Sequence, residues 1–122
     1  MAIGGKQQKE SILSEGVQPV IIPDPGNGGA IDVSRPGICE ITTAGAETRT
    51  LADPTFRGQQ IDLVMVSDGG DCVITAASPI NQAANTTITL NDVGDFVRLV
   101  GKYNATDGWE WVVIVNDGAT LG

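Results

Sequence analysis

Apolar and polar residues alternate in short runs from residue 37 onward, and this period of two is typical of β-strands. The alternation is clearest near the C-terminus, where Trp109 and Trp111 would share one face of a strand and Glu110 would lie on the other. Val113 and Val115 continue the face of the two tryptophans. The pattern predicts strands over residues 38–43, 47–51, 60–66, 72–76, 86–90, 96–102 and 109–115.

Turn-forming residues separate the predicted strands. Glycine, asparagine or aspartate occurs in the segments 44–46, 68–70, 91–94, 107–108 and 116–118, as is usual for tight turns. Two segments have the same form, Asp-x-Gly-Asp before an apolar strand, at 68–71 and 92–95. We interpret them as one hairpin turn used twice. Short strands separated by such turns predict an all-β fold, an antiparallel β-sandwich or barrel that is jelly-roll-like.

The first 36 residues differ in composition from the rest of the chain. Prolines at 19, 23, 25 and 36 interrupt this region, and proline cannot donate a hydrogen bond within a central strand. We therefore predict an extended N-terminal arm over residues 1–36, with room for a short helix at 7–15, and a β domain over residues 37–122. In the alternative interpretation, Val20, Ile21 and Ile22 form an edge strand of that domain.

The chain is acidic, because its 122 residues include 15 Asp and Glu against 7 Lys and Arg, for a net charge of −8. The basic residues are scattered, whereas binding to nucleic acid or to an anionic membrane needs a basic face. The longest apolar run, 112–115, is far shorter than a membrane span, and the first residues lack the apolar stretch of a signal peptide. We expect neither nucleic acid nor a membrane as a partner.

The sequence contains no histidine, which excludes the Ser-His and Cys-His pairs of nucleophilic catalysis. Catalysis by a pair of carboxylates remains possible, because two acids can hydrolyse a glycosidic bond without histidine. Asp68 with Asp71, or Asp92 with Asp95, could form such a pair. These aspartates lie in predicted turns, where their side chains commonly accept backbone hydrogen bonds. We therefore predict that the protein is not an enzyme and uses no cofactor.

Candidate metal ligands are few. Asp68 and Asp71 offer closely spaced carboxylates that suit calcium, but the further ligands of a calcium-binding loop are missing. Calcium therefore stays an open alternative, and no metal site is predicted. Cys39 and Cys72 lack the C-x-x-C spacing of a zinc or redox motif. We expect two reduced, buried thiols, with one disulfide as the alternative.

The C-terminal half carries several short, hairpin-like motifs. They read GQQIDL at 58–63, TTITLNDVGD at 86–95, VRLV at 97–100, GWEWVV at 108–113 and NDGATL at 116–121. This order resembles the β-rich accessory virion proteins of tailed phages, namely capsid decoration (cement) proteins and domains of head or tail fibres. The resemblance implies a homotrimer fixed to the virion at the outer capsid surface, with the major capsid protein as its partner. It also implies synthesis in the host cytoplasm and no catalytic or cofactor residues.

We therefore expect a structural virion protein that binds and stabilises a phage capsid. The arm would bury apolar surface on the shell or on a neighbouring subunit, through the partner-binding residues Ile12, Leu13, Val20, Ile21 and Ile22. One alternative is a receptor- or carbohydrate-binding module of a phage fibre, with Trp109 or Trp111 exposed to stack on a sugar, although a tryptophan stripe at this spacing is more typical of a core. The alternative ranked last is a small glycosidase that uses acidic residues.

Overall fold

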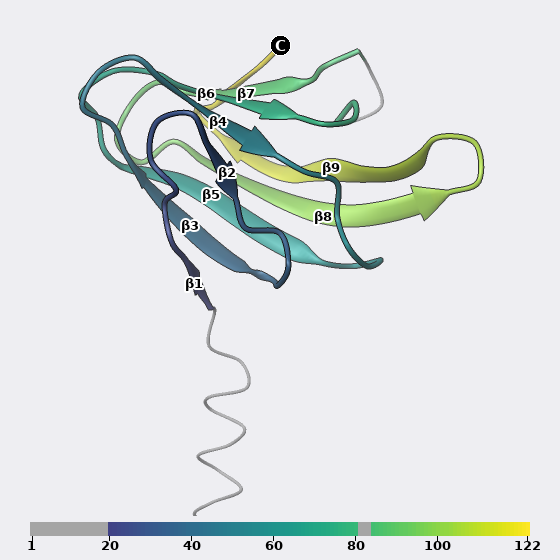
Figure 1. Ribbon diagram of the computed structural model, residues 1–122. Helices are drawn as coiled ribbons and strands as arrows, with labels where there is room; N and C mark the ends of the chain where they lie inside the picture. The colour runs from purple at the N-terminus through teal and green to yellow at the C-terminus, as the bar shows by residue number, and fades with distance from the viewer. Residues whose placement is uncertain (1–19, 81–83) are drawn as a thin grey trace, which may run out of the picture.

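Every regular element is a β-strand in the computed structural model, which describes residues 20–80 and 84–122 (Figure 1). The all-β prediction is therefore confirmed, and each predicted strand begins and ends within a residue or two of an observed one. The strands are β1 (Ile21–Ile22), β2 (Gly29–Ile31), β3 (Gly37–Thr42), β4 (Glu47–Leu51), β5 (Gln60–Ser67), β6 (Cys72–Ala76), β7 (Thr87–Leu90), β8 (Phe96–Asn104), β9 (Gly108–Asp117) and β10 (Thr120–Leu121).

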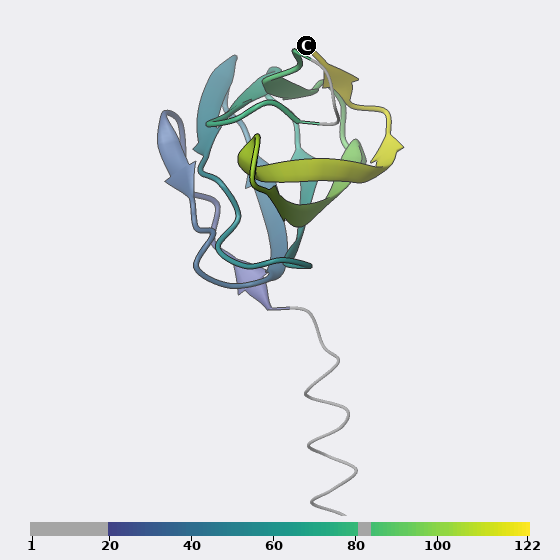
Figure 2. The ribbon, with the colours of Figure 1, turned by 90° about the vertical axis from the view of Figure 1, so that its right-hand side faces the viewer.

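The strands form two five-stranded sheets that pack against each other (Figure 2). Sheet A has the strand order β1-β3-β5-β8-β9, and sheet B has the order β10-β7-β6-β4-β2. The sandwich prediction is confirmed, whereas the barrel prediction is wrong because the two sheets do not close into one. Cys39 and Cys72 are free and buried in the core between the sheets, which confirms the expectation of reduced thiols. The core also contains Ile41, Leu51, Ile61, Leu63, Met65, Ile74, Ile88, Leu90, Val97 and Leu99.

The chain winds between the two sheets from β1 to β6. Strands β1, β3 and β5 belong to sheet A and strands β2, β4 and β6 to sheet B, so each strand is followed by one in the opposite sheet. Because the chain returns to each sheet in the same direction, these neighbours are parallel; Ile21 pairs with Ile38, and Glu47 pairs with Cys72. The remaining ladders are antiparallel. The prediction of a purely antiparallel sandwich is therefore wrong, and both sheets are mixed.

The two Asp-x-Gly-Asp segments connect strands of different sheets. Residues 68–71 lead from β5 in sheet A to β6 in sheet B, and residues 91–95 lead from β7 in sheet B to β8 in sheet A. The prediction of two hairpin turns is wrong, because a turn sequence does not specify which sheet the next strand joins. The turn role of Asp95 is confirmed, since its Oδ2 accepts hydrogen bonds from the backbone N–H groups of Asn91 and Asp92 at 2.8 and 3.0 Å.

Residues 20–36 belong to the sandwich. Strand β1 pairs with β3 and β2 pairs with β4, while Ile22 and Ile31 are only 1% and 2% exposed within the core. The structure therefore assigns these residues to the β domain rather than to an arm, as the edge-strand interpretation of Ile21 and Ile22 predicts. Residues 1–19, including the helix considered at 7–15, lie outside the described residues.

A β-bulge changes the alternation in β9. Trp111 is 1% exposed and Val113 packs against the core, as predicted. The register between β8 and β9 then shifts at the extra residue Ile114, so that Val115 pairs with Arg98. This shift turns Val115 to the outer side of sheet A, where the side chain is 41% exposed. The prediction that Val115 shares the face of Trp111 is therefore wrong.

Candidate protein-interaction face

Exposed apolar residues begin at the first strand of sheet A. Val20 and Ile21, two of the predicted partner-binding residues, are 43% and 56% exposed. Ile22 alternates to the inner side and belongs to the core, so the structure gives it a packing position rather than a surface one. Ile12 and Leu13 lie outside the described residues. The surface that surrounds Ile21 is therefore the first candidate for partner binding.

The register of sheet A continues this surface across every strand of the sheet. Ile21 on β1 pairs with Ile38 on β3, and Ile38 pairs with Asp62 on β5. Arg98 on β8 and Val115 on β9 complete the same row. Alternate residues of a strand lie on one side, so residues two positions along these strands share this outer surface. Its apolar members, which we call the sheet A face, are Ile21, Ile38, Val64, Phe96, Val100, Val112 and Val115.

Solvent reaches the whole sheet A face. Ile21 and Val115 are exposed, and its other members are half-buried by their neighbours in the sheet. Single exposed apolar residues are ordinary on a protein surface, but a contiguous apolar patch marks a site of interaction. Each Å² of apolar surface removed from water contributes about 25 cal/mol. The sheet A face therefore consists of two exposed and five half-buried apolar side chains that lie around the Asp62–Arg98 pair.

Two ion pairs lie within this outer surface, which also carries Glu40 and Asp117. Arg98 makes a two-point ion pair with Asp62, with Nε–Oδ1 and Nη2–Oδ2 distances of 2.9 and 3.1 Å. The hydrogen bond and negative charge of Asp62 raise the pKa of Arg98, and the Arg98 guanidinium lies 5.7 Å from the centre of the Phe96 ring. Lys102 on β8 is paired with Glu110 on β9. A partner could therefore cover this surface without leaving these charges unpaired.

The sequence contained a signal for this second apolar surface. In the strand 96–102, Phe96 and Val100 lie at one parity and Val97 and Leu99 at the other. A strand that is apolar at both parities is typical of burial on both sides. Alternation with a period of two explains the inner pair alone, so Phe96 and Val100, on either side of Arg98, are the sequence signal for apolar residues on the outer side of this strand.

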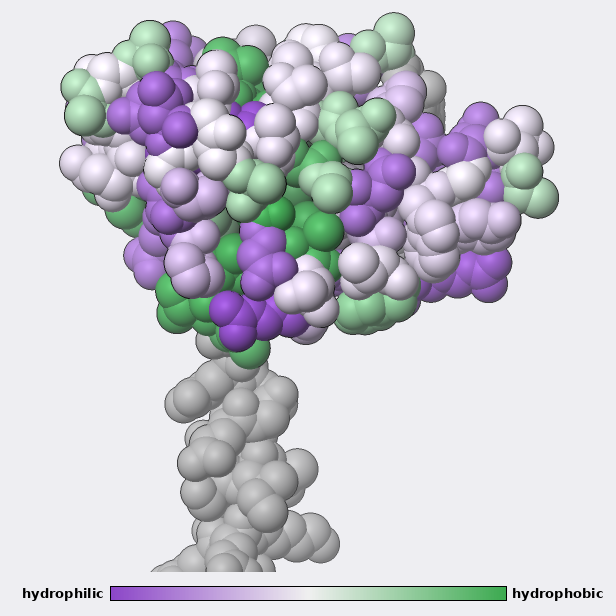
Figure 3. Space-filling model, in the orientation of Figure 1, coloured by the Kyte–Doolittle hydropathy of each residue, from purple (hydrophilic) through white to green (hydrophobic). Residues whose placement is uncertain are grey.

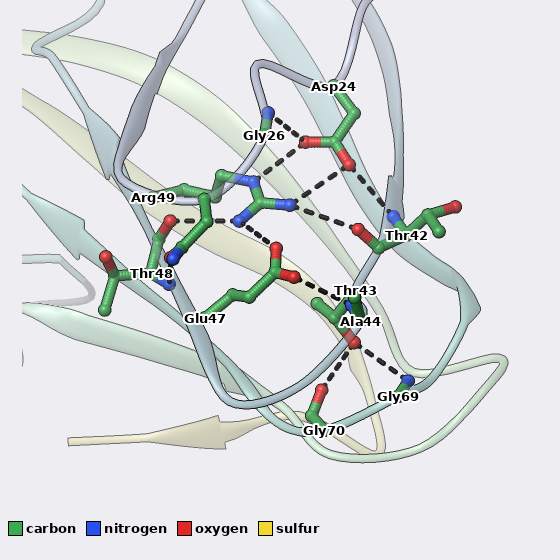
Figure 4. Close-up of polar contacts among 11 residues, drawn as sticks. Asp24, Gly26, Thr42, Thr43, Ala44, Glu47, Thr48, Arg49, Gly69 and Gly70 are labelled. Atoms are coloured by element: carbon green, nitrogen blue, oxygen red, sulfur yellow. Dashed lines mark hydrogen bonds and ion pairs between the residues drawn. The ribbon is translucent and has the colours of Figure 1, made fainter.

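A separate charged cluster joins the two sheets at one end of the sandwich (Figure 4). Arg49 on β4 is fully buried, and its guanidinium donates to Asp24 at 2.8 and 3.1 Å. The other donors of the guanidinium bond to a Glu47 carboxylate oxygen at 2.9 Å and to the carbonyls of Thr48 and Thr42 at 3.0 and 3.2 Å. All five N–H donors of an arginine are thus occupied. We interpret this cluster as structural, since it has no donor left for a ligand.

The remaining acidic candidates do not converge on a site. Among residues 20–80 and 84–122, no group of three or more His, Cys, Asp or Glu residues could hold a metal ion. The carboxylate of Asp71 accepts a hydrogen bond from Nδ2 of Asn91 at 3.3 Å, and Asp95 bonds to the backbone of its own turn. The calcium alternative at Asp68 and Asp71 therefore gains no further ligand from the described residues.

The two tryptophans have different environments. Trp111 is a core residue, as predicted, and its indole N–H donates to the carbonyl of Ala52 at 2.8 Å. Trp109 is half-buried near the end of the β8–β9 hairpin, with its ring centre 5.0 Å from that of Tyr103. Tyr103 is 40% exposed, and the guanidinium of Arg57 lies 5.2 Å from its ring centre. Burial removes Trp111 from any stacking site, whereas Tyr103 and Trp109 present aromatic surface to solvent.

The outward positions in the described strands of sheet B are uncharged. One row across the sheet is Ala30, Thr50, Thr75 and Thr87, and the next is Thr48, Val73, Thr89 and Thr120. Beside the first row lies an apolar hollow of about 350 Å³, lined by several small residues that include Ala30, Ala52 and Ala77. Figure 3 shows hydrophobic residues gathered beside β2 in this region. The two sheets therefore present different outer surfaces, aliphatic with paired charges on sheet A and threonine-rich on sheet B.

Neither a family model nor a curated protein matches the sequence. In the part of the chain that the structure describes, no helix is long and apolar enough to cross a membrane. Function must therefore be inferred from the surfaces of this fold.

Proposed function

We propose that the protein is a non-enzymatic structural component of a virion, a trimeric decoration protein that binds the outer surface of a tailed-phage capsid and stabilises it. The observation that carries this proposal is the sheet A face, whose apolar residues lie around the Asp62–Arg98 pair and beside the pair of Lys102 with Glu110. Surfaces of this composition are typical of permanent contacts between proteins. The motif order in the C-terminal half, which resembles that of accessory virion proteins, favours a virion as the assembly.

Stabilisation of the shell would follow from mass action. A protein that binds the assembled capsid, and not its separated subunits, shifts the equilibrium toward the assembled form. A trimer brings three binding segments to neighbouring sites, which raises the effective concentration of each. We assign the contact with the shell to the N-terminal segment, which carries Ile12 and Leu13 in the sequence, and to the part of the sheet A face that this segment reaches at the exposed residues Val20 and Ile21.

Co-sedimentation with capsids tests this function. The full chain would be mixed with purified capsids of the encoding phage that lack it, and the pellet and the heat resistance of the shells would be measured. We expect wild-type protein to pellet with the capsids and the double variant Ile12→Ser, Leu13→Ser to remain in solution. The matched control is Gln7→Ser, Gln8→Ser in the same segment, which should bind like the wild type. Wild-type protein that neither pellets nor protects the capsids would refute the proposal.

Exposed aromatic residues favour a second candidate function, the binding of host carbohydrate by a phage fibre module. Tyr103 and Phe56 are 40% and 45% exposed, and aromatic ring faces are the surfaces on which sugars stack. Titration with host cell-surface glycans should then change the fluorescence of Trp109 in the wild type. Tyr103→Phe should retain this response and Tyr103→Ala should lose it. An unchanged wild-type spectrum at saturating glycan would exclude this candidate.

A further inference from the structure

The β8–β9 hairpin extends past the end of the sandwich and carries its core-facing side into solvent (Figure 1). Gly101 pairs with Trp111, which is only 1% exposed, and Tyr103 and Trp109 form the next pair of the same parity. Alternate residues lie on one side of a strand, so Tyr103 and Trp109 continue the side on which Trp111 is buried. Tyr103 is 40% exposed. The inner side of sheet A therefore ends in an accessible pair of aromatic rings.

Arg57 lies over this aromatic pair. Its guanidinium is 5.2 Å from the centre of the Tyr103 ring, and the ring centres of Tyr103 and Trp109 are 5.0 Å apart with the planes tilted by 51°. In the described part of the chain, every other basic side chain forms an ion pair with a carboxylate, namely Arg35, Arg49, Arg98 and Lys102. Among residues 20–80 and 84–122, Arg57 alone has no such partner. Its charge is therefore available to an anionic ligand.

The loop before β5 holds Arg57 against the hairpin. The backbone N–H of Gly58 donates to the carbonyl of Gly101 at 2.8 Å, and the N–H of Gly101 donates to the carbonyl of Gln59 at 2.7 Å. Gln59 is fully buried, and its side-chain amide donates to the carbonyl of Val33 at 2.7 Å. These bonds order the loop in the absence of a ligand. Less conformational entropy is therefore lost when a ligand binds between the loop and the hairpin.

The charges around Arg57 restrict the kind of anion that it can bind. The two carboxylates of the hairpin have other partners, because Glu110 is paired with Lys102 on the outer side of the sheet and Asp107 accepts a hydrogen bond from Nδ2 of Asn104 at 3.1 Å. The whole chain has a net charge of −8, so it repels a polyanion such as nucleic acid. One accessible cation beside two aromatic rings instead suits a small ligand with a single negative charge.

We propose that Arg57, Tyr103 and Trp109 form a binding site for a carboxylated sugar. This inference rests on the second candidate function, the binding of carbohydrate, and specifies the charge of the ligand. The apolar face of a sugar ring stacks on aromatic rings, and the planar guanidinium of arginine binds a carboxylate through two parallel hydrogen bonds. A carboxylated sugar supplies both features in one residue, so it fits this site better than a neutral sugar does.

Tryptophan fluorescence of the full chain tests the inference, because Trp111 is buried and a ligand at the hairpin would reach Trp109 alone. The probes are the methyl glycosides of glucuronic acid, galacturonic acid and N-acetylneuraminic acid. Each acid is compared with its methyl ester, which has the same ring without the charge. We expect at least one acid to change the fluorescence at low salt and to bind about tenfold more tightly than its ester.

Three variants, each shown to be folded by urea unfolding, assign the effect to residues. Arg57→Met should remove the preference for the acid over its ester. The matched control is Arg35→Met, which makes the same change in net charge at another exposed arginine and should retain the preference. Tyr103→Ala should lose the binding of acid and ester alike, because both stack on the aromatic pair.

The outcomes separate this inference from the function on which it rests. Sugars that bind equally well as acid and ester, or a preference for the acid that Arg57→Met retains, would overturn the inference while supporting carbohydrate binding. No response to any of these sugars would overturn both. If Arg57→Met also failed to pellet with capsids in that case, the carboxylate that Arg57 binds would belong to the capsid protein rather than to a sugar.

Discussion

Arg49 on β4 and Asp24 in the connection between β1 and β2 form a two-point ion pair, with Nε–Oδ1 and Nη2–Oδ2 distances of 2.8 and 3.1 Å. The Arg49 side chain is fully buried, and its guanidinium also bonds to the carbonyl of Thr42 on β3. These bonds therefore tie β4 of sheet B to β3 of sheet A and to the connection that follows β1. In this position the two residues control stability rather than binding.

Loss of the buried arginine should destabilise the fold strongly. Arg49→Met would leave the Asp24 and Glu47 carboxylates, which are 18% and 13% exposed, without their partner. We expect the free energy of unfolding in urea to fall by about 3–5 kcal/mol. The control is Arg35→Met. Both side chains of the Arg35–Asp32 pair are exposed to solvent, so this pair should contribute less than about 1 kcal/mol to the free energy of unfolding. Equal losses in the two variants would contradict the structural role of Arg49.

Stability should depend on pH through the carboxylate of Asp24. Partial burial alone would raise the pKa of Asp24, but hydrogen bonds from Arg49 and from two backbone amides outweigh it and hold the pKa below 3.8. A carboxylate with a lowered folded-state pKa contributes stability that is present above its unfolded pKa and lost as the pH falls through the folded value. We therefore expect the urea midpoint to be level from pH 7 to about pH 5 and to fall below about pH 4.

The variant Asp24→Asn tests whether the Asp24 carboxylate causes the fall of the urea midpoint at low pH. Its urea midpoint should be lower than that of the wild type at pH 7, and the difference should shrink as the pH falls below about 4. A constant difference at every pH would show that titration of Asp24 does not contribute. The chain contains no histidine, so a steep change near pH 6 would also contradict this account.

Both cysteines should be unreactive in the folded protein. Burial raises the pKa of the Cys39 thiol to about 12 and also raises that of Cys72, and the thiolate is the form that attacks thiol reagents. At pH 8 we expect slow reaction of native protein with a disulfide reagent and rapid reaction of both thiols in urea. Cys39→Ser should leave a single reactive thiol in urea. Rapid reaction of the native protein would contradict burial, and no reaction in urea would indicate a disulfide.

Gly70 should resist substitution because of a close backbone approach. A Cβ atom at Gly70 would overlap the backbone of Gly45 and Ala46 in the turn before β4, whereas a Cβ at Gly45 would have nothing within 4 Å. Gly70→Ala should lower the free energy of unfolding by about 1–3 kcal/mol. Gly45→Ala should leave it unchanged or raise it by up to about 1 kcal/mol, because it restricts the unfolded chain. Thermal unfolding of both variants decides the matter, and an equally stable Gly70→Ala would refute the contact.

The strand 47–51 shows what the local alternation of residues can predict and what it cannot. Its bounds were predicted residue for residue, because alternation between outward Thr48 and Thr50 and inward Leu51 is a property of neighbours in the chain. The same alternation places Arg49 on the inner side with Leu51, but it does not show how a charged side chain could be buried there. Burial of that arginine requires Asp24, which a separate part of the chain brings to it. The charge cluster was therefore beyond prediction from the pattern alone.

The sequence by itself determined that the chain forms short strands with turns between them and that histidine takes no part in its chemistry. Only the tertiary structure decided which sheet each strand joins, that Ile22 belongs to the core, and that Ile38, Val100 and Val115 gather on one outer face. The physical reason is the separation along the chain of the residues that interact. Alternation and turn formation depend on residues a few positions apart, whereas sheet membership depends on where each connection crosses the core and on packing between distant segments.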